Sequence, residues 1–293
     1  MSEYESFIVK DLIAEAARTL AKAGVPQARL EAMSLIGHII GHDRTYLLTH
    51  PEVQLASSDA QTLRQIAEQR AAGKPLQYIT GRQAFYGLDF EVTPDVLIPR
   101  PETELLVEVA IDLLESSTDP QIVCDLGTGS GCIAVSILHE LLHVRAVGID
   151  ISLRALVVAG RNAEKFSTRE RLAFVASDCF TALDPHRTNF AMIVSNPPYI
   201  AEKAMPELQR EVRVYEPRAA LTPGGDGLQV IRRILAEAPP FLKAGGHLLM
   251  EMGFDQREAV EQIINPETWK LIDVHKDLQG IPRVVVLRRT QAI

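Results

Sequence analysis

The residues best suited to chemistry lie in one short run, Asn196-Pro197-Pro198-Tyr199. Its two prolines exclude a helix and stiffen the loop that follows a predicted strand at 191–194. Asn196 offers a side-chain oxygen, Pro197 a backbone carbonyl and Tyr199 a flat ring. Two acceptors held about 3 Å from a planar NH2 group aim its lone pair and stabilise positive charge that grows on nitrogen. We therefore predict that this loop, Pro198 included, binds and activates such a nitrogen; the alternative is a plain proline turn.

A second run, Asp125-Leu126-Gly127-Thr128-Gly129-Ser130-Gly131, joins a predicted strand at 122–126 to a predicted helix at 133–142. Its glycines let the backbone approach a ligand without a clash at Cβ. A dinucleotide fingerprint would need a further glycine where Cys132 stands. The run is instead similar to the nucleotide loop of S-adenosylmethionine-dependent methyltransferases, with NAD-type binding and a tight structural turn as alternatives. The residues expected to hold the cofactor here are Gly127, Thr128, Gly129, Ser130 and Gly131.

Two acids follow the next predicted strands, at 146–150 and 172–175. Asp150 ends the first of them, where a carboxylate can accept hydrogen bonds from both hydroxyls of a ribose; the alternative is an acid before the helix that Ser152 begins. Asp178 can accept from an adenine amino group, with Cys179 and Phe180 against the ring. For Asp178 the alternative is a loop acid or a helix cap.

The run at 196–199 after the fourth strand is typical of methyltransferases that act on amide or exocyclic amino nitrogens. Further segments resemble the release factor glutamine methyltransferases, the HemK/PrmC family. The resemblance extends from the N-terminal helical region to the end of the chain. The segments that carry it include PLQYITG at 75–81, IPRPETE at 98–104, YEPRAAL at 215–221 and GGDGL at 224–228.

The resemblance implies transfer of a methyl group from S-adenosyl-L-methionine to the glutamine side chain in the Gly-Gly-Gln motif of peptide chain release factors. It implies that Asn196 and Pro197 bind the glutamine amide and that Tyr199 packs against it. It also implies that the helical region docks the release factor. Relatives often carry an aromatic residue where Cys179 stands, so two alternatives remain: the adenine sandwich is weaker here, or Phe180 compensates beside the adenine.

Three regions are expected along the chain. Residues 1–83 show only helical periodicity, with an apolar stripe at Leu12, Ala16 and Leu20 and no catalytic constellation. Residues 84–98 read as a β-hairpin linker. Residues 99–293 alternate strands and helices, which predicts a parallel sheet covered on both faces. The last two strands, at 270–274 and 283–287, have too short a connection for a crossover and should pair antiparallel.

The predicted fold class is therefore α/β: a Rossmann-like, seven-stranded methyltransferase domain with a small all-helical N-terminal domain. Within the helical domain, Asp43 and Ser58 are expected to cap helices. His38 and His42 lie one helical turn apart, but no further ligands complete a metal site, so no metal is expected.

Composition excludes several classes of protein. The 293 residues are 46% hydrophobic and 23% charged, which are globular values. Three cysteines without a CxxC pair argue against a disulfide framework. No apolar run nears the roughly 20 residues that span a bilayer, and the start, MSEYESFIVK, does not resemble a signal peptide. A cytoplasmic protein without membrane contact is expected.

Two rival functions remain at this stage. A nucleic-acid adenine-amino methyltransferase would share the chemistry of the 196–199 loop. The net charge of −8 and the lack of a basic recognition region count against it and against direct nucleic-acid binding. A methyltransferase-like binding module without activity is the second rival, and the intact glycines, Asp150 and Asn196 count against it.

Overall fold

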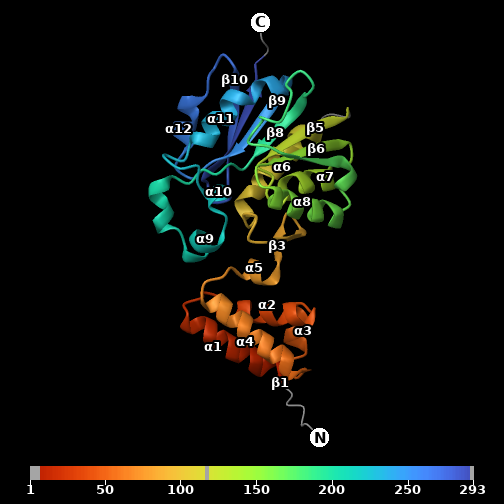
Figure 1. Ribbon diagram of the computed structural model, residues 1–293, viewed down its shortest axis with the longest axis vertical. Coiled ribbons are helices and arrows are strands. Elements are labelled where there is room, and N and C mark those ends of the chain that lie inside the picture. The colour runs from red at the N-terminus through yellow and green to blue at the C-terminus, as the bar shows by residue number, and fades with distance from the viewer. Residues whose placement is uncertain (1–6, 116–118, 291–293) are drawn as a thin grey trace. The chain divides into compact units, whose positions relative to one another are not determined.

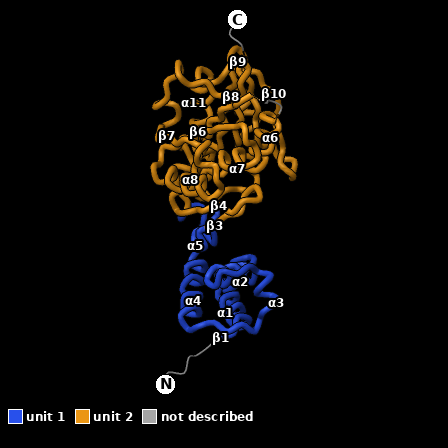
Figure 2. The backbone as a smooth tube through the Cα atoms, turned by 90° about the vertical axis from the view of Figure 1, so that its right-hand side faces the viewer, with its two compact units in different colours: residues 1–81, 209–215 blue, residues 82–208, 216–293 orange. Residues whose placement is uncertain are grey.

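The structure, a computed structural model, describes residues 7–115 and 119–290 and divides the chain into two compact units (Figures 1 and 2). One unit comprises residues 1–81 with 209–215, and the other comprises 82–208 with 216–293. Residues 1–6 belong to the N-terminal stretch that was compared above with signal peptides, and they lie outside the described residues. The boundaries predicted at residues 83 and 98 stay predictions.

The first unit is built mainly of helices around one apolar core. Leu12, Ala16 and Leu20 are buried in that core, as the stripe predicted. Asp43 caps a helix by accepting from the Tyr46 N–H at 2.8 Å. The elements are β1 (Phe7–Ile8), α1 (Val9–Lys22), α2 (Ala28–Ile40), α3 (Arg44–Thr49), β2 (Gln54–Leu55), α4 (Ser57–Ala71), α5 (Leu76–Thr80) and α9 (Arg210–Tyr215).

Two details of this unit differ from the sequence-based expectation. Ser58 does not cap α4, because the helix already begins at Ser57 and Ala56 occupies the N-cap position. The short strands β1 and β2 pair antiparallel, which helical periodicity did not predict.

Helix α9 joins this unit although it lies far along the chain (Figure 2). Arg70 of α4 is 8% exposed and forms salt bridges with Glu31 of α2 at 2.5 Å and with Glu211 of α9 at 2.8 Å. Two carboxylates from distant segments thus meet one nearly buried guanidinium.

The second unit begins with the expected hairpin, formed by β3 (Arg82–Phe85) and β4 (Leu88–Glu91). Asn162, fully buried on α8 (Leu153–Lys165), holds this hairpin. Its side chain exchanges hydrogen bonds with both the N–H and the C=O of Glu91, at 2.8 and 2.9 Å, and donates to the Ser130 carbonyl at 2.9 Å. One amide therefore links the hairpin to the glycine loop.

A seven-stranded sheet forms the centre of this unit, as predicted, in the order β10-β11-β9-β8-β5-β6-β7. Strands β9, β8, β5, β6 and β7 run parallel, and β11 is antiparallel to both β9 and β10. The antiparallel terminal hairpin is thereby confirmed. The strands are β5 (Gln121–Leu126), β6 (Val144–Asp150), β7 (Leu172–Ala176), β8 (Phe190–Ser195), β9 (Leu242–Glu251), β10 (Trp269–Lys276) and β11 (Pro282–Arg289).

Helices cover both faces of the sheet (Figure 1). Successive residues of a strand point to opposite faces, so Val284 and Val286 of β11 enter one core while Val285 and Leu287 enter the other. The first face carries α6 (Glu104–Glu115), α7 (Cys132–Glu140) and α8, and the second carries α11 (Gln229–Glu237) and α12 (Arg257–Ile263). Shorter turns are η1 (Pro101–Thr103), η2 (Arg169–Arg171), η3 (Glu202–Glu207), α10 (Arg218–Leu221) and η4 (Pro239–Phe241).

The order of the strands fixes where a ligand can bind. Strands β6 and β7 lie on one side of β5, whereas β8 lies on the other side. Such a reversal leaves a crevice at the carboxyl ends of the two central strands. Ser195 joins these ends by donating to the Leu126 carbonyl at 2.7 Å. The glycine loop and the Asn196 loop therefore start side by side. No helix in the described ranges combines the length and apolarity that crossing a bilayer requires.

Candidate active site

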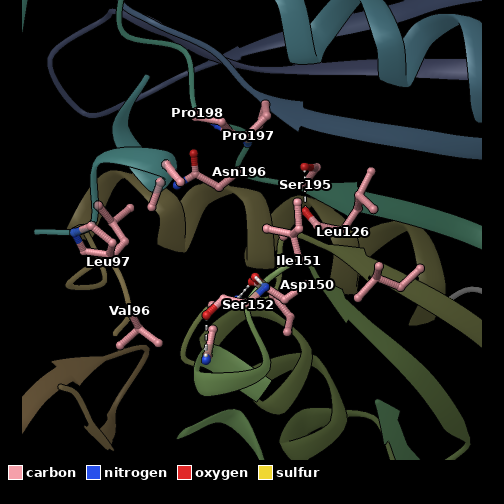
Figure 3. Close-up of a pocket in the computed structure, with 18 of the residues that line it drawn as sticks. Val96, Leu97, Leu126, Asp150, Ile151, Ser152, Ser195, Asn196, Pro197 and Pro198 are labelled. Carbon is pink, nitrogen blue, oxygen red and sulfur yellow. Dashed lines mark hydrogen bonds between the residues drawn. The ribbon is translucent and has the colours of Figure 1, made fainter. Parts of the chain in front are cut away.

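A cavity of about 450 Å³ lies at this crevice (Figure 3). Its size falls within the range of small-ligand sites, about 300–1,000 Å³. The walls come from the glycine loop, the ends of β6, β7 and β8, and the segments at 95–103 and 217–223. Val96 and Leu97 from the first of these segments face the Asn196 loop across the cavity (Figure 3).

The glycine loop has a backbone that only glycine adopts readily. Gly127, Gly129 and Gly131 have φ values of 78°, 53° and 81°. At Gly131 a Cβ would also lie 3.1 Å from the Ala159 Cβ of α8. The loop can thus approach both a ligand and helix α8 closely.

Asp150 is held from both sides at the cavity wall. One carboxylate oxygen accepts from the Gly129 N–H at 2.9 Å and the other from the Ser152 N–H at 2.8 Å. Burial raises the pKa of Asp150, while these backbone donors favour its charged form. Ser152 also caps α8, as its side chain accepts from Ala155. Because an ionised carboxylate offers about four acceptor sites, each oxygen retains capacity for a ligand hydroxyl.

Asp178 and Cys179 also line the cavity, as expected. Asp178 forms a salt bridge at 2.6 Å with Arg233 of α11, a partner that the sequence did not suggest. Phe180, however, does not take the place expected for it beside a ligand ring. It is 3% exposed and stacks on Phe241 in the core, with ring centroids 4.8 Å apart. Of the two alternatives, compensation by Phe180 is therefore wrong, because its ring packs in the core that also contains Ile231 and Ile234 of α11.

Asn196, Pro197 and Pro198 reach the cavity wall together (Figure 3). The side-chain nitrogen of Asn196 donates to the Thr103 hydroxyl at 3.0 Å. This bond occupies the nitrogen end of the amide, so the oxygen is the end left for a ligand.

The structure does not place Tyr199 on the cavity wall with these three residues. Its ring packs on the core beneath the loop, and its hydroxyl donates to Glu251 at 3.0 Å. Burial and the Glu251 charge raise the pKa of Tyr199. Its carbonyl accepts from Gln256 at 2.9 Å. Tyr199 therefore anchors the loop from behind.

Sequence reasoning missed several polar residues that support the site. Glu251 is 1% exposed, and Thr103 donates to it at 2.6 Å. Glu216 is also buried; it accepts from the Ile98 N–H at 3.2 Å and pairs with Arg100, a cavity residue, at 2.5 Å. The available signal was an acid at the end of the apolar run HLLME and the acids in the segments at 98–104 and 215–221.

Asp125 is a second buried acid close to the glycine loop. Its Oδ2 accepts from the Thr128 hydroxyl at 2.7 Å and from the Ala134 N–H at 3.2 Å. Within the described part of the chain, its Oδ1 has no hydrogen-bond partner. Burial raises its pKa to about 6. In the same described residues, no group of three or more His, Cys, Asp or Glu side chains could hold a metal ion.

Two known protein families match separate parts of the chain. A family described as the PrmC N-terminal domain matches residues 11–81. A family described as the methyltransferase small domain matches residues 102–243. The second match contains the glycine loop, Asp150, Asp178 and the Asn196 loop.

Individual relatives extend over nearly the whole chain. A release factor glutamine methyltransferase from Koribacter versatilis (strain Ellin345) is 40% identical over 281 residues, covering 96% of this chain and 98% of the relative. One from Burkholderia pseudomallei (strain K96243) is 43% identical over 262 residues, covering 88% and 91%. The solved structure of a methyltransferase from Pyrococcus furiosus matches 71% of this chain and 92% of its own, with a TM-score of 0.51 and 16% identity, which is a likeness of fold.

Proposed function

This chain belongs to the release factor glutamine methyltransferase family, and on that premise we propose that it methylates the glutamine amide in the Gly-Gly-Gln motif of peptide chain release factors. The methyl donor is S-adenosylmethionine. We further propose that the enzyme acts in the cytoplasm and recognises its substrate as a protein, without direct nucleic-acid contact. The net charge of −8 supports that last point, because gripping nucleic acid requires neutralised phosphates.

The residues of the cavity fit the methyl donor. S-adenosylmethionine supplies, when bound, a methyl group on a positively charged sulfur that leaves readily. The backbone at 127–131 has no Cβ at its glycines to obstruct a ligand, and the Asp150 carboxylate has acceptor capacity for a ribose diol. Asp178 and Cys179 would lie at the adenine.

Asn196 and Pro197 would prepare the glutamine nitrogen. An amide nitrogen is a poor nucleophile because its lone pair is delocalised into the carbonyl. The Asn196 side-chain oxygen and the Pro197 carbonyl would accept its two hydrogens and so fix its position. The same acceptors stabilise the positive charge that grows as the new C–N bond forms, each by roughly 1.5–3 kcal/mol. The nitrogen then releases one proton to solvent and becomes a neutral secondary amide.

One structural observation supports the proposed methyl transfer in addition to family membership. The Asn196 amide is held by Thr103 in the same cavity wall as Asp150 and the glycine loop. An acceptor for an amide and an acceptor for a ribose therefore share a single cavity, as a transfer between two bound molecules requires.

The direct test is the mass of a purified release factor after incubation with the enzyme and S-adenosylmethionine. We expect a gain of one methyl group that fragmentation maps to the glutamine of the Gly-Gly-Gln motif. A release factor with alanine at that glutamine is the matched control. Duplex DNA in a parallel reaction tests the adenine-amino alternative. Methylated adenine together with an unmodified release factor would overturn the proposal.

Asn196→Ala tests the residue on which the chemistry depends. Removing one preorganised hydrogen-bonding group in other enzymes lowers kcat by about 10²–10³-fold, and we expect a similar loss here. The affinity for S-adenosylmethionine, measured by calorimetry, should change little. Near wild-type turnover of Asn196→Ala on the release factor would remove Asn196 from the proposed mechanism.

A further inference from the structure

We propose that Glu251 is a positioning residue that acts through Thr103 to fix which end of the Asn196 amide faces the substrate, and so makes the site select an amide over a carboxylate. This inference rests on the proposed function. It concerns two residues that do not belong to the 196–199 loop and that come from the end of β9 and from η1.

The three side chains form a continuous chain of hydrogen bonds. Glu251 accepts from the Thr103 hydroxyl at 2.6 Å, and Thr103 accepts from the Asn196 side-chain nitrogen at 3.0 Å. The other oxygen of Glu251 accepts from the Tyr199 hydroxyl at 3.0 Å. Both oxygens of this 1% exposed carboxylate are thus occupied by hydroxyl donors.

The direction of each bond follows from the chemistry of the groups. An ionised carboxylate can only accept, so the single hydroxyl hydrogen of Thr103 must point to Glu251. The lone pairs of Thr103 then face Asn196, which must present its NH2 end. The two ends of an amide have nearly the same shape, so only their partners decide between the two orientations. Glu251 is therefore the group that sets the orientation.

This orientation has a consequence for the substrate. With its nitrogen bound to Thr103, Asn196 presents its oxygen, which accepts a hydrogen from a glutamine amide. A glutamate side chain has no hydrogen to donate when ionised, and its negative charge faces the same oxygen. Leaving polar groups unpaired is how hydrogen-bonding sites reject close analogues. The buried carboxylate thus selects the substrate without touching it.

Burial raises the pKa of Glu251, which taken alone favours its neutral form. The two hydroxyl donors and the Arg283 guanidinium favour the carboxylate and oppose this effect only in part, and the Glu102 charge adds to it, so the pKa of Glu251 stays raised. In its carboxylate form Glu251 accepts from both hydroxyls, and this arrangement places the lone pairs of Thr103 against the Asn196 nitrogen.

Glu251→Gln is the variant that tests the proposal. Glutamine has the same shape but only one acceptor oxygen, so Thr103 and Tyr199 cannot both donate to it. If its NH2 faces Thr103, the Thr103 hydrogen turns to Asn196, and Asn196 flips to present its own NH2 to the substrate. The site would then favour a carboxylate.

The measurement is the binding of two release factors, one with Gly-Gly-Gln and one with Gly-Gly-Glu, in the presence of S-adenosylhomocysteine. The wild type should prefer glutamine, and Glu251→Gln should reduce that preference at least tenfold. Turnover of the glutamine form should fall roughly 10- to 100-fold in kcat. The affinity for S-adenosylhomocysteine should stay within about twofold, because Asp150 is held by the Gly129 and Ser152 N–H groups and not through Glu251.

Thr103 provides a pair of variants that decide the matter if Glu251→Gln does not fold. Thr103→Val keeps the shape but removes the hydroxyl, so the preference for glutamine should also fall. Thr103→Ser restores the hydroxyl and should recover most of the preference. An unchanged preference in Thr103→Val would overturn the inference, because this variant removes the hydroxyl through which Glu251 acts. Failure of the wild type to methylate the glutamine form would instead overturn the proposed function, so the two failures are distinguishable.

Discussion

Asp150 holds the glycine loop through the Gly129 N–H, and we propose that it also binds the ribose of the methyl donor. Mutation can separate these two roles. Asp150→Ala removes the acceptors for a ribose diol and for the Gly129 and Ser152 N–H groups. We expect the affinity for S-adenosylmethionine to fall roughly 10- to 100-fold, since hydrogen bonds to a charged group contribute about 1.5–3 kcal/mol each. Calorimetry measures this change.

Thermal unfolding without ligand measures only the role of Asp150 in stability, because no ribose is then present to bind. Asp150→Asn keeps one acceptor oxygen and should bind with intermediate affinity. If Asp150→Ala bound S-adenosylmethionine as tightly as the wild type, the ribose assignment would have to be abandoned.

Asp125 makes the stability of the protein depend on pH. Its folded-state pKa is about 6, above the ordinary 3.8, because burial disfavours the charged form. The folded state therefore binds the proton more tightly than the unfolded state, and this contribution is complete below 3.8 and lost as the pH rises through 6. The raised pKa corresponds to about 3 kcal/mol in the free energy of unfolding.

The check is urea unfolding of the wild type and of Asp125→Asn at pH values between about 4 and 7. Asparagine cannot ionise and keeps an oxygen for Thr128 and the Ala134 N–H. The wild type should lose free energy of unfolding relative to the variant as the pH rises. Parallel curves for the two proteins would contradict the prediction.

Cavity residues that lie at the end of a strand could be predicted from the sequence. Polar side chains whose hydrogen-bond partners lie far away in the sequence could not. Asp150 and Asn196 line the cavity as predicted, because one ends a recognisable strand and the other directly follows one. Glu251 and Thr103, 148 residues apart, meet only through the fold. For Tyr199 and Phe180 the residue type suggested a ring against a ligand, but packing on the core decided their positions.

Among the elements, the close approach of the glycine loop to α8 is open to test. Gly131→Ala places a Cβ 3.1 Å from Ala159 at a φ of 81°. Gly87→Ala, in the turn of the β3–β4 hairpin, has a φ of 73° but open space around the new atom. The backbone alone costs roughly 1–2 kcal/mol at either position.

We therefore expect Gly131→Ala to lower the free energy of unfolding more than Gly87→Ala does. Only Gly131→Ala should also weaken binding of S-adenosylmethionine. Urea unfolding and calorimetry measure the two effects. Equal losses of stability would show that α8 moves aside without cost.

The order of elements in the second unit could be predicted almost entirely from periodicity and connection length. All seven strands and the antiparallel pair at the end follow from these two signals. The position of α9 could not be predicted in this way. None of its six residues is buried, and one contact that ties α9 to the first unit is the charge pair of Glu211 with Arg70, which no local pattern announces.

For the molecule as a whole, the helical unit is expected to recognise the release factor. A chain shortened to begin at Arg82, if it folds, should bind S-adenosylmethionine but methylate the intact release factor poorly. Its turnover on a short Gly-Gly-Gln peptide should suffer less, because a peptide has no docking surface to lose. Full activity on the intact factor would refute the docking role.

This shortened chain also loses Arg70, the partner of Glu211. Glu211→Gln in the full-length chain serves as the control, because it removes only that ion pair. If Glu211→Gln alone reproduced the loss of activity, the cause would be the α9 segment rather than docking.

Residues 209–215 belong to the same unit as residues 1–81, and this grouping limits how two genes of this family can recombine. A hybrid gene with a single junction near residue 81 would combine the helical region of one parent with the α9 of the other. Arg70 and Glu31 would then come from one ancestor and Glu211 from another. Successful recombination requires the short segment to travel with the long one, so the two should share a common inheritance even though more than a hundred codons separate them.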